Sequence, residues 1–170
     1  MFRSSRIARL RDRLLRRGVR SVAPGPWSFG AAPPNEQAAY DRILPYAEAI
    51  YLVIAADGVH TPVERDALLG AIRYLTEGEL GAQAADHMIV QFQRELERDG
   101  IELRLDEVAS RVCREPEDRE LALSLAAAAA MADGQAGPTE ESAVVGLAER
   151  LGFSPSRLQA LLVDDEPAQA

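Results

Sequence analysis

Apolar residues recur at intervals of three and four along most of the chain, which is the spacing of one buried face of an α-helix. No segment beyond residue 35 alternates apolar and polar positions as a half-buried strand would. The pattern predicts helices over residues 36–56, 62–75, 85–98, 105–113, 116–132, 138–151 and 155–162. We therefore expect an all-α fold, a compact bundle of about seven helices.

Two of these helices are apolar enough to lie at the centre of the bundle. The first ends in the apolar run of residues 50–56, and residues 121–132 are apolar on every face and mostly alanine. Gly58 and Gly134 follow the two runs, as is typical of a left-handed helix stop. Pro45 predicts a kink or a restart within the first helix.

The loops after these two helices carry the same motif. Ala-Asp-Gly-x-x-x-Pro-x-Glu occurs at residues 56–64 and again at residues 132–140, an offset of 76 positions. Such a repeat indicates one helix-loop-helix unit used twice, so we expect internal pseudo-two-fold symmetry. Further identities at the same offset pair Ala67 with Ala143, Gly70 with Gly146 and Leu75 with Leu151.

Each copy of the motif supplies two carboxylates, Asp57 with Glu64 and Asp133 with Glu140. Each glutamate falls at the third position of a helix, where it can form a capping box and favour the positive end of the helix dipole. Each aspartate follows a helix C-terminus, where the dipole disfavours an anion. Its charge is offset either by the amides of the turn or by a cation held between aspartate and glutamate.

The cation interpretation makes all four carboxylates candidate metal ligands, and both interpretations stay open at this point. Oxygen-only ligands favour Mg²⁺ or Ca²⁺ over zinc. A structural zinc site is excluded more directly, because the chain has one cysteine, Cys113, and two histidines. The apolar spacing places Cys113 in the core. A lone cysteine also indicates a reducing, cytoplasmic setting.

Charge divides the chain sharply. Residues 1–34 contain eight arginines and one aspartate, a charge of +7, although the whole chain carries −8. The remaining body is strongly acidic and should repel nucleic acid. All basic residues are arginine, which excludes a P-loop or a Schiff-base lysine.

The domain organisation follows from these patterns. We expect a basic amphipathic extension over residues 1–22, a Pro/Gly-rich linker over 23–35, a helical domain over 36–163 and an acidic tail over 164–170. Within residues 3–20 the apolar positions share one helical face and arginine covers the rest.

The duplicated Ala-Asp-Gly-x-x-x-Pro-x-Glu motif, each copy preceded by an apolar helix, resembles the TerB family of tellurite-resistance proteins and the related N-terminal domain of DjlA-type co-chaperones. The likeness covers about residues 36–163. The resemblance implies a compact all-helical domain, an association with stress response and no enzymatic activity. It also implies an acidic patch that binds divalent cations or partner proteins, which by position is Asp57, Glu64, Asp133 and Glu140.

Two functions compete on this basis. The first is a non-enzymatic binding or scaffold domain whose acidic loops recruit a divalent cation, a protein partner or both. The alternative is a peripheral membrane adaptor that docks on anionic lipid through residues 3–20. A basic helix could instead lie on the acidic body as a tether, with Trp27 and Phe29 as anchors. A metal-dependent hydrolase is disfavoured, because no positioned base accompanies the carboxylates.

Overall fold

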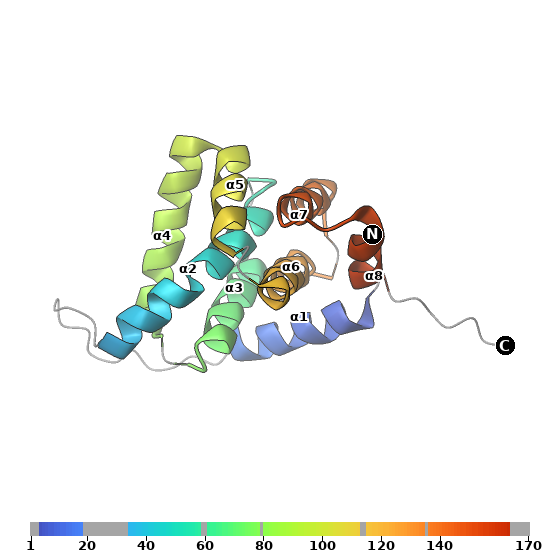
Figure 1. The fold of residues 1–170 in the computed structure, drawn as a ribbon. Helices are drawn as coiled ribbons and strands as arrows, with labels where there is room; N and C mark the ends of the chain where they lie inside the picture. The colour runs from blue at the N-terminus through green and yellow to red at the C-terminus, as the bar shows by residue number, and fades with distance from the viewer. Residues whose placement is uncertain are drawn as a thin grey trace.

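The computed structural model describes residues 4–18, 34–58, 61–78, 80–112, 115–134 and 136–163. Within these ranges the chain forms helices and no strand, which confirms the all-α prediction. Residues 23–33 of the predicted linker over 23–35, which include Trp27 and Phe29, lie outside the described residues, as do Cys113 and the tail at 164–170, whereas the second helix begins within that linker, at Pro34. The helices are α1 (Ser5–Gly18), α2 (Pro34–Ile54), α3 (Pro62–Leu75), α4 (Ala82–Asp99), α5 (Ile101–Val112), α6 (Pro116–Ala130), α7 (Pro138–Arg150) and α8 (Pro155–Leu162) (Figure 1).

Helices α2 and α6 form the centre of the molecule. They pack against each other, and α3, α4, α5 and α7 surround the pair (Figure 1). Residues 122–130 of α6 are all buried, as are residues 47–54 of α2. Alanine in α6 lets the neighbouring helices approach closely, since a methyl group adds little bulk. The apolar runs therefore predicted the central helices correctly.

Most predicted helix ends differ from the structure by one to four residues, and two differences have a clear physical reason. Helix α2 continues through Pro45 as one element, although proline removes one hydrogen bond of the helix. Ile43 and Ala47 are buried on either side, so packing holds this part of the helix in place. Helix α5 begins at Ile101, directly after Gly100, whose φ of 78° turns the chain sharply out of α4.

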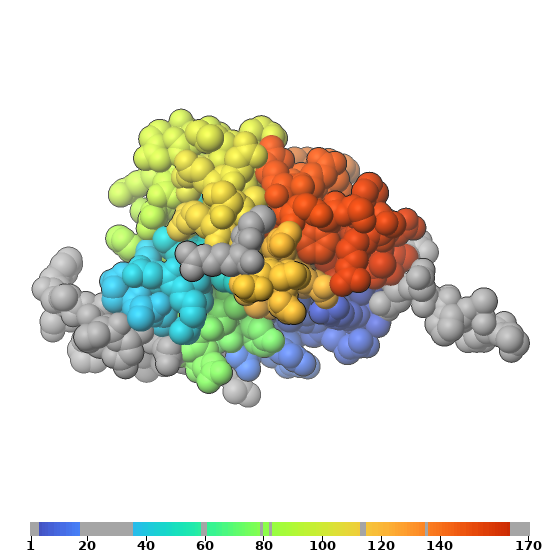
Figure 2. Space-filling view, in the orientation of Figure 1, coloured from blue at the N-terminus to red at the C-terminus, as the bar shows by residue number. Residues whose placement is uncertain are grey.

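Helix α1 is part of the bundle. It packs along α3 and α6, and Ile7 and Leu14 are fully buried in the common core. The amide of Ser4 donates to the carbonyl of Leu162 at 2.9 Å, which ties the start of α1 to the end of α8. The apolar face of the predicted amphipathic helix thus contacts the protein, and the space-filling view shows α1 beneath the rest of the body (Figure 2).

A close approach of backbones fixes α1 against α3. A Cβ atom added to Gly70 would lie 1.9 Å from the carbonyl oxygen of Leu14, so only glycine fits at this crossing. At the C-terminal end of α1, Arg73 donates to the carbonyl of Arg17 at 2.5 Å. The Arg17 guanidinium lies 5.2 Å from the centre of the Tyr74 ring, a cation–π distance.

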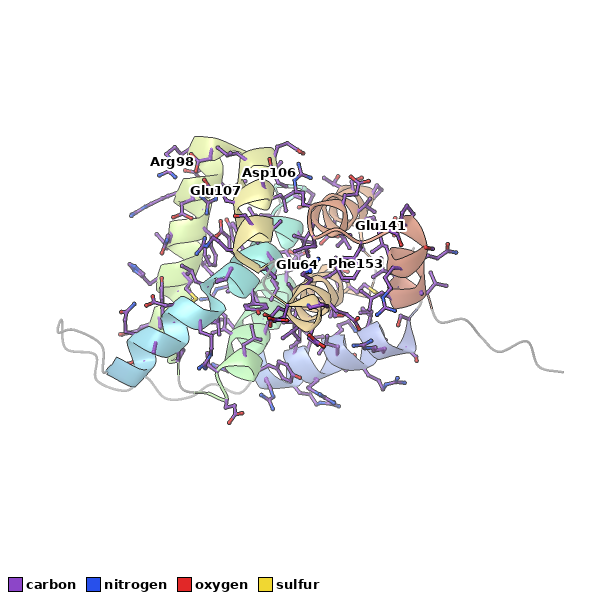
Figure 3. The ribbon with its side chains drawn as sticks, in the orientation of Figure 1. Glu64, Arg98, Asp106, Glu107, Glu141 and Phe153 are labelled. Carbon is purple, nitrogen blue, oxygen red and sulfur yellow. The ribbon has the colours of Figure 1, made fainter. Side chains whose placement is uncertain are left out.

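A buried ion-pair network joins α2, α4 and α5. Arg104 is 4% exposed and bonds Glu48, which is 1% exposed. Arg104 also donates to Glu95 at 2.8 Å and Glu107 at 2.5 Å, and Arg111 donates to the second oxygen of Glu48 at 3.2 Å. Figure 3 places Glu107 on this α4–α5 side of the molecule. Burial raises the pKa of Glu48, and the two arginines oppose that shift.

Candidate functional site

The ends of α2 and α6 have the same local geometry. The amides of Gly58 and Gly134 each donate to a carbonyl three residues earlier, at 3.0 Å in both turns. Both glycines have positive φ values, 76° and 107°, which residues with a side chain rarely adopt. Asp57 and Asp133 directly precede these glycines and are exposed. The predicted glycine stops are thus confirmed.

The glutamates of the motif cap the next helices, as the sequence predicted. The amide of Thr61 donates to Glu64 Oε2 at 2.7 Å, and the amide of Glu64 donates to Thr61 Oγ1 at 3.2 Å. In the second copy the amide of Gly137 donates to Glu140 Oε2 at 2.6 Å. Glycine has no side chain to return the bond, so α7 has half of the capping box.

Both glutamates are buried, and Glu140 is incompletely satisfied. Glu64 is 6% exposed and Glu140 is 5% exposed. Glu64, labelled in Figure 3, lies in the first turn of α3. The Oε1 atom of Glu140 is shielded from solvent and has no hydrogen-bond partner among the described residues. A buried carboxylate oxygen without a donor is costly, because it has lost its hydration.

The surroundings of Glu140 raise its pKa to about 7. Burial is the largest cause, and the charges of Glu64, Asp57 and Asp133 add to it, while the hydrogen bond from the Gly137 amide opposes it. The two loops therefore bring Asp57, Glu64 and Asp133 close enough for their charges to act on Glu140. Near neutral pH, Glu140 is therefore protonated in part of the molecules.

The arrangement is not a formed metal centre. Among the described histidine, cysteine, aspartate and glutamate residues, no group of three or more is placed so that it could hold a metal ion. One oxygen of each buried glutamate already accepts a backbone amide. The metal site predicted from Asp57, Glu64, Asp133 and Glu140 therefore stays a prediction, as does the internal pseudo-two-fold symmetry.

Sequence reasoning missed two polar groups inside the bundle. One is the Glu48–Arg104 pair, whose members are 56 positions apart in the sequence. The other is Ser124 of α6, which is 3% exposed and has an unpartnered hydroxyl among the described residues. The sequence does contain a signal for Ser124, since it is a single serine within an otherwise apolar run. Buried hydroxyls usually have a hydrogen-bond partner, so a serine at such a position needs an explanation.

Comparison with known proteins gives one family. The family model described as "Tellurite resistance protein TerB" matches residues 46–162, which is more than half of the chain. The matched residues include both loops, the whole of α6, the part of α2 from residue 46 onwards and all four carboxylates of the motif. Neither the curated proteins nor the solved structures contain a significant match.

Proposed function

The chain belongs to the TerB family, and we propose that it is a binding domain whose two acidic loops hold a divalent cation, Mg²⁺ or Ca²⁺. The family is generally non-enzymatic and takes its name from tellurite resistance. A role in that response or another stress response is part of the proposal. The single observation that carries it is Glu140, a buried carboxylate among three others with one oxygen unpartnered.

A cation would relieve the electrostatic strain at this position. It would neutralise part of the repulsion that raises the pKa of Glu140, and it would give Oε1 a partner. The donors available are carboxylate oxygens, which suit Mg²⁺ and Ca²⁺. Because the described side chains do not form a ready coordination shell, binding would require water ligands or a modest movement of the loops.

The same charge could attract a protein instead of an ion. Asp57 and Asp133 are exposed, so a basic segment of a partner protein could reach the loops. A cation and a basic segment would compete for the same carboxylates, and the experiment below distinguishes them.

Docking on anionic lipid through residues 3–20 stays a separate proposal. The packing of α1 limits which of its side chains could contact the lipid. Ile7 and Leu14 are buried against the bundle, so they could enter a membrane only if α1 detached. The arginine-bearing face could still contact lipid headgroups electrostatically. No helix among the described residues has the length and apolar character needed to span a bilayer.

Thermal unfolding of the full chain tests the cation proposal. The melting temperature is measured in EDTA, then with Mg²⁺ and with Ca²⁺, for the natural chain and for Asp57→Ala combined with Asp133→Ala. An ion at about 100 times its Kd adds ~2.7 kcal/mol to the free energy of unfolding, which raises Tm by several degrees in a domain of this size. We expect this rise in the natural chain and its loss in the double variant.

The control variant combines Glu97→Ala with Glu149→Ala, two exposed acidic residues away from the loops. It removes the same charge and should keep the full ion-dependent rise. Equal stabilisation of all three proteins would show general screening and reject the site. If neither ion changes the Tm of the natural chain, the cation proposal is rejected. The loops would then be a candidate site for a basic segment of a partner protein only.

A further inference from the structure

A cleft of about 520 Å³ lies between α1, α6 and α8, on a part of the molecule that the acidic loops do not line. Its wall on α1 carries Arg6, Arg9 and Arg13, which the helical spacing places on one face. Arg157 of α8 lies across the cleft, and Glu117 and Glu120 of α6 add two negative charges. Four arginines and two glutamates give a net charge of +2 in a chain whose overall charge is −8.

Two of the four arginines already share one carboxylate partner. Arg6 and Arg157 each donate to Glu120 at 2.9 Å. These bonds lower the pKa of Glu120 although its partial burial acts to raise it, so the carboxylate stays ionised. The pairing orders the two arginines at the edge of the cleft and leaves the charge of the other two to be explained.

Arg9 and Arg13 have no carboxylate partner among the described residues. Arg9 donates to the hydroxyl of Ser5 at 3.1 Å, and Arg13 has no hydrogen bond or ion pair within the described chain. Two guanidinium groups four positions apart on one helical face repel each other unless an anion lies between them. Both arginines are exposed, so this part of the cleft presents two guanidinium groups to an anionic ligand.

Ser124 supplies a second, independent indication of a ligand. Its side chain lines the cleft from α6, it is 3% exposed, and its hydroxyl has no partner among the described residues. A serine within a helix ordinarily bonds the carbonyl four positions earlier or points to solvent, and Ser124 does neither. The hydroxyl is shielded from solvent in this structure, and rotation of the side chain toward the cleft would let a ligand oxygen give it the bond that it lacks.

We infer that this cleft binds a phosphomonoester through Arg9, Arg13 and the hydroxyl of Ser124. A phosphate monoester carries a charge of about −1.5 to −2 and three acceptor oxygens, which match two guanidinium groups and one hydroxyl. A carboxylate has one charge and two oxygens, so it would satisfy this set less completely. The cleft volume lies within the range of about 300–1,000 Å³ for small-molecule sites.

The rest of the lining indicates that the phosphate belongs to an organic molecule. Leu10, Tyr74 and Leu121 add apolar surface beside the arginines. Inorganic phosphate would leave that surface in water, whereas an organic group would cover it. The phosphate could come from a soluble metabolite or from the headgroup of phosphatidic acid, and both present the same monoester group.

Calorimetric titration of the full chain with phenyl phosphate tests the soluble source, and co-sedimentation with phosphatidylcholine vesicles containing phosphatidic acid tests the lipid source. Vesicles with phosphatidylglycerol, a diester, control for negative surface charge. The site variants are Arg9→Gln with Arg13→Gln, and Ser124→Ala. The matched control is Arg65→Gln with Arg94→Gln, two exposed arginines on α3 and α4.

We expect the arginine double variant to weaken phosphomonoester binding by about tenfold or more, since charge-assisted hydrogen bonds are lost. Ser124→Ala should weaken binding by roughly threefold to tenfold without lowering Tm, because the removed hydroxyl has no partner to lose. The control should bind as the natural chain does. Binding of phenyl phosphate identifies a soluble ligand, and binding confined to phosphatidic acid vesicles identifies the lipid.

Three results would overturn the inference. They are no binding to either probe, binding that the arginine double variant and Ser124→Ala leave unchanged, and equal binding to phosphatidic acid and phosphatidylglycerol. The last result would show attraction to negative charge without recognition of a monoester.

Discussion

Glu140 is the residue on which the electrostatics of the acidic loops converge. Its pKa of about 7 follows from burial and from three neighbouring carboxylates, so the folded protein holds a proton there at pH values where an ordinary glutamate is ionised. Glu64 occupies the corresponding place in the first copy, where the additional bond from Glu64 to Thr61 completes the capping box. The two loops thus share their backbone turns but differ in the hydrogen bonds that their glutamates make.

Replacing Glu140 with glutamine should change how stability depends on pH. The pKa is 4.5 for an ordinary glutamate and about 7 in the folded chain, so the natural protein loses stability as pH rises through this interval. Glutamine removes that loss, because it stays neutral and its amide oxygen can still accept the Gly137 amide. We expect the variant to exceed the natural chain in free energy of unfolding by on the order of 2 kcal/mol above about pH 8, and by much less below about pH 5.

Urea unfolding at the two pH values measures this difference, with Glu149→Gln as the control on the exposed face of α7. Glu149→Gln should show the pH dependence of the natural chain. Parallel pH profiles for Glu140→Gln and the natural chain would contradict the raised pKa.

The Arg104 network makes a second prediction at the scale of single residues. Arg104→Ala would leave Glu48 buried with only Arg111 near it, so we expect a loss of about 3–5 kcal/mol in free energy of unfolding. Arg65→Ala is the control, because Arg65 pairs with Asp86 at the surface and both side chains are 52% exposed. Exposed pairs contribute about 0–1 kcal/mol, so chemical denaturation should separate the two variants clearly.

Among the elements, α1 gives the clearest test of packing. Replacing Gly70 with alanine and replacing its counterpart Gly146 with alanine should affect stability in opposite ways. Alanine at Gly70 would collide with the backbone of Leu14 and force α1 away from α3. Alanine at Gly146 would lie 3.3 Å from the guanidinium of Arg150, whose bonds to Asp106 and Glu102 at the surface can adjust to a shift of a few tenths of an ångström. Alanine is otherwise favoured over glycine within a helix by about 1 kcal/mol.

We therefore expect Gly70→Ala to lower the free energy of unfolding by about 2 kcal/mol or more, and Gly146→Ala to leave it unchanged or raise it slightly. Hydrogen exchange of the α1 amides reports the cause, since detachment of α1 would remove their protection in the first variant alone. Equal stability of the two variants would show that α1 does not pack closely on α3.

For the whole molecule, the sequence predicted the elements whose signal is local. Apolar runs over residues 50–56 and 121–132 identified the central helices α2 and α6, and the Pro-x-Glu pattern identified the starts of α3 and α7. The docking of α1 was not decided by sequence, since an amphipathic helix has the same pattern whether its apolar face meets lipid or protein. The contact at Gly70 and the Glu48–Arg104 pair depend on residues far apart in the chain.

The candidate site was predicted only where its signal is local in the sequence. The repeated motif identified the four carboxylates, and the structure shows that their charges act on Glu140. The burial of Glu140 and its unpartnered oxygen depend on how the loops pack, which no spacing in the sequence encodes. The arginine cleft likewise needs α8 beside α1, an arrangement set by the packing of the whole bundle.

The most direct measurement of the central claim is calorimetric titration of the full chain with Mg²⁺ and with Ca²⁺, below about pH 6 and above about pH 8. A cation at the acidic loops must displace the proton of Glu140, so the account predicts tighter binding at the higher pH and proton release near neutrality. In Glu140→Gln that pH dependence should disappear. Absence of binding by the natural chain at both pH values would contradict the account.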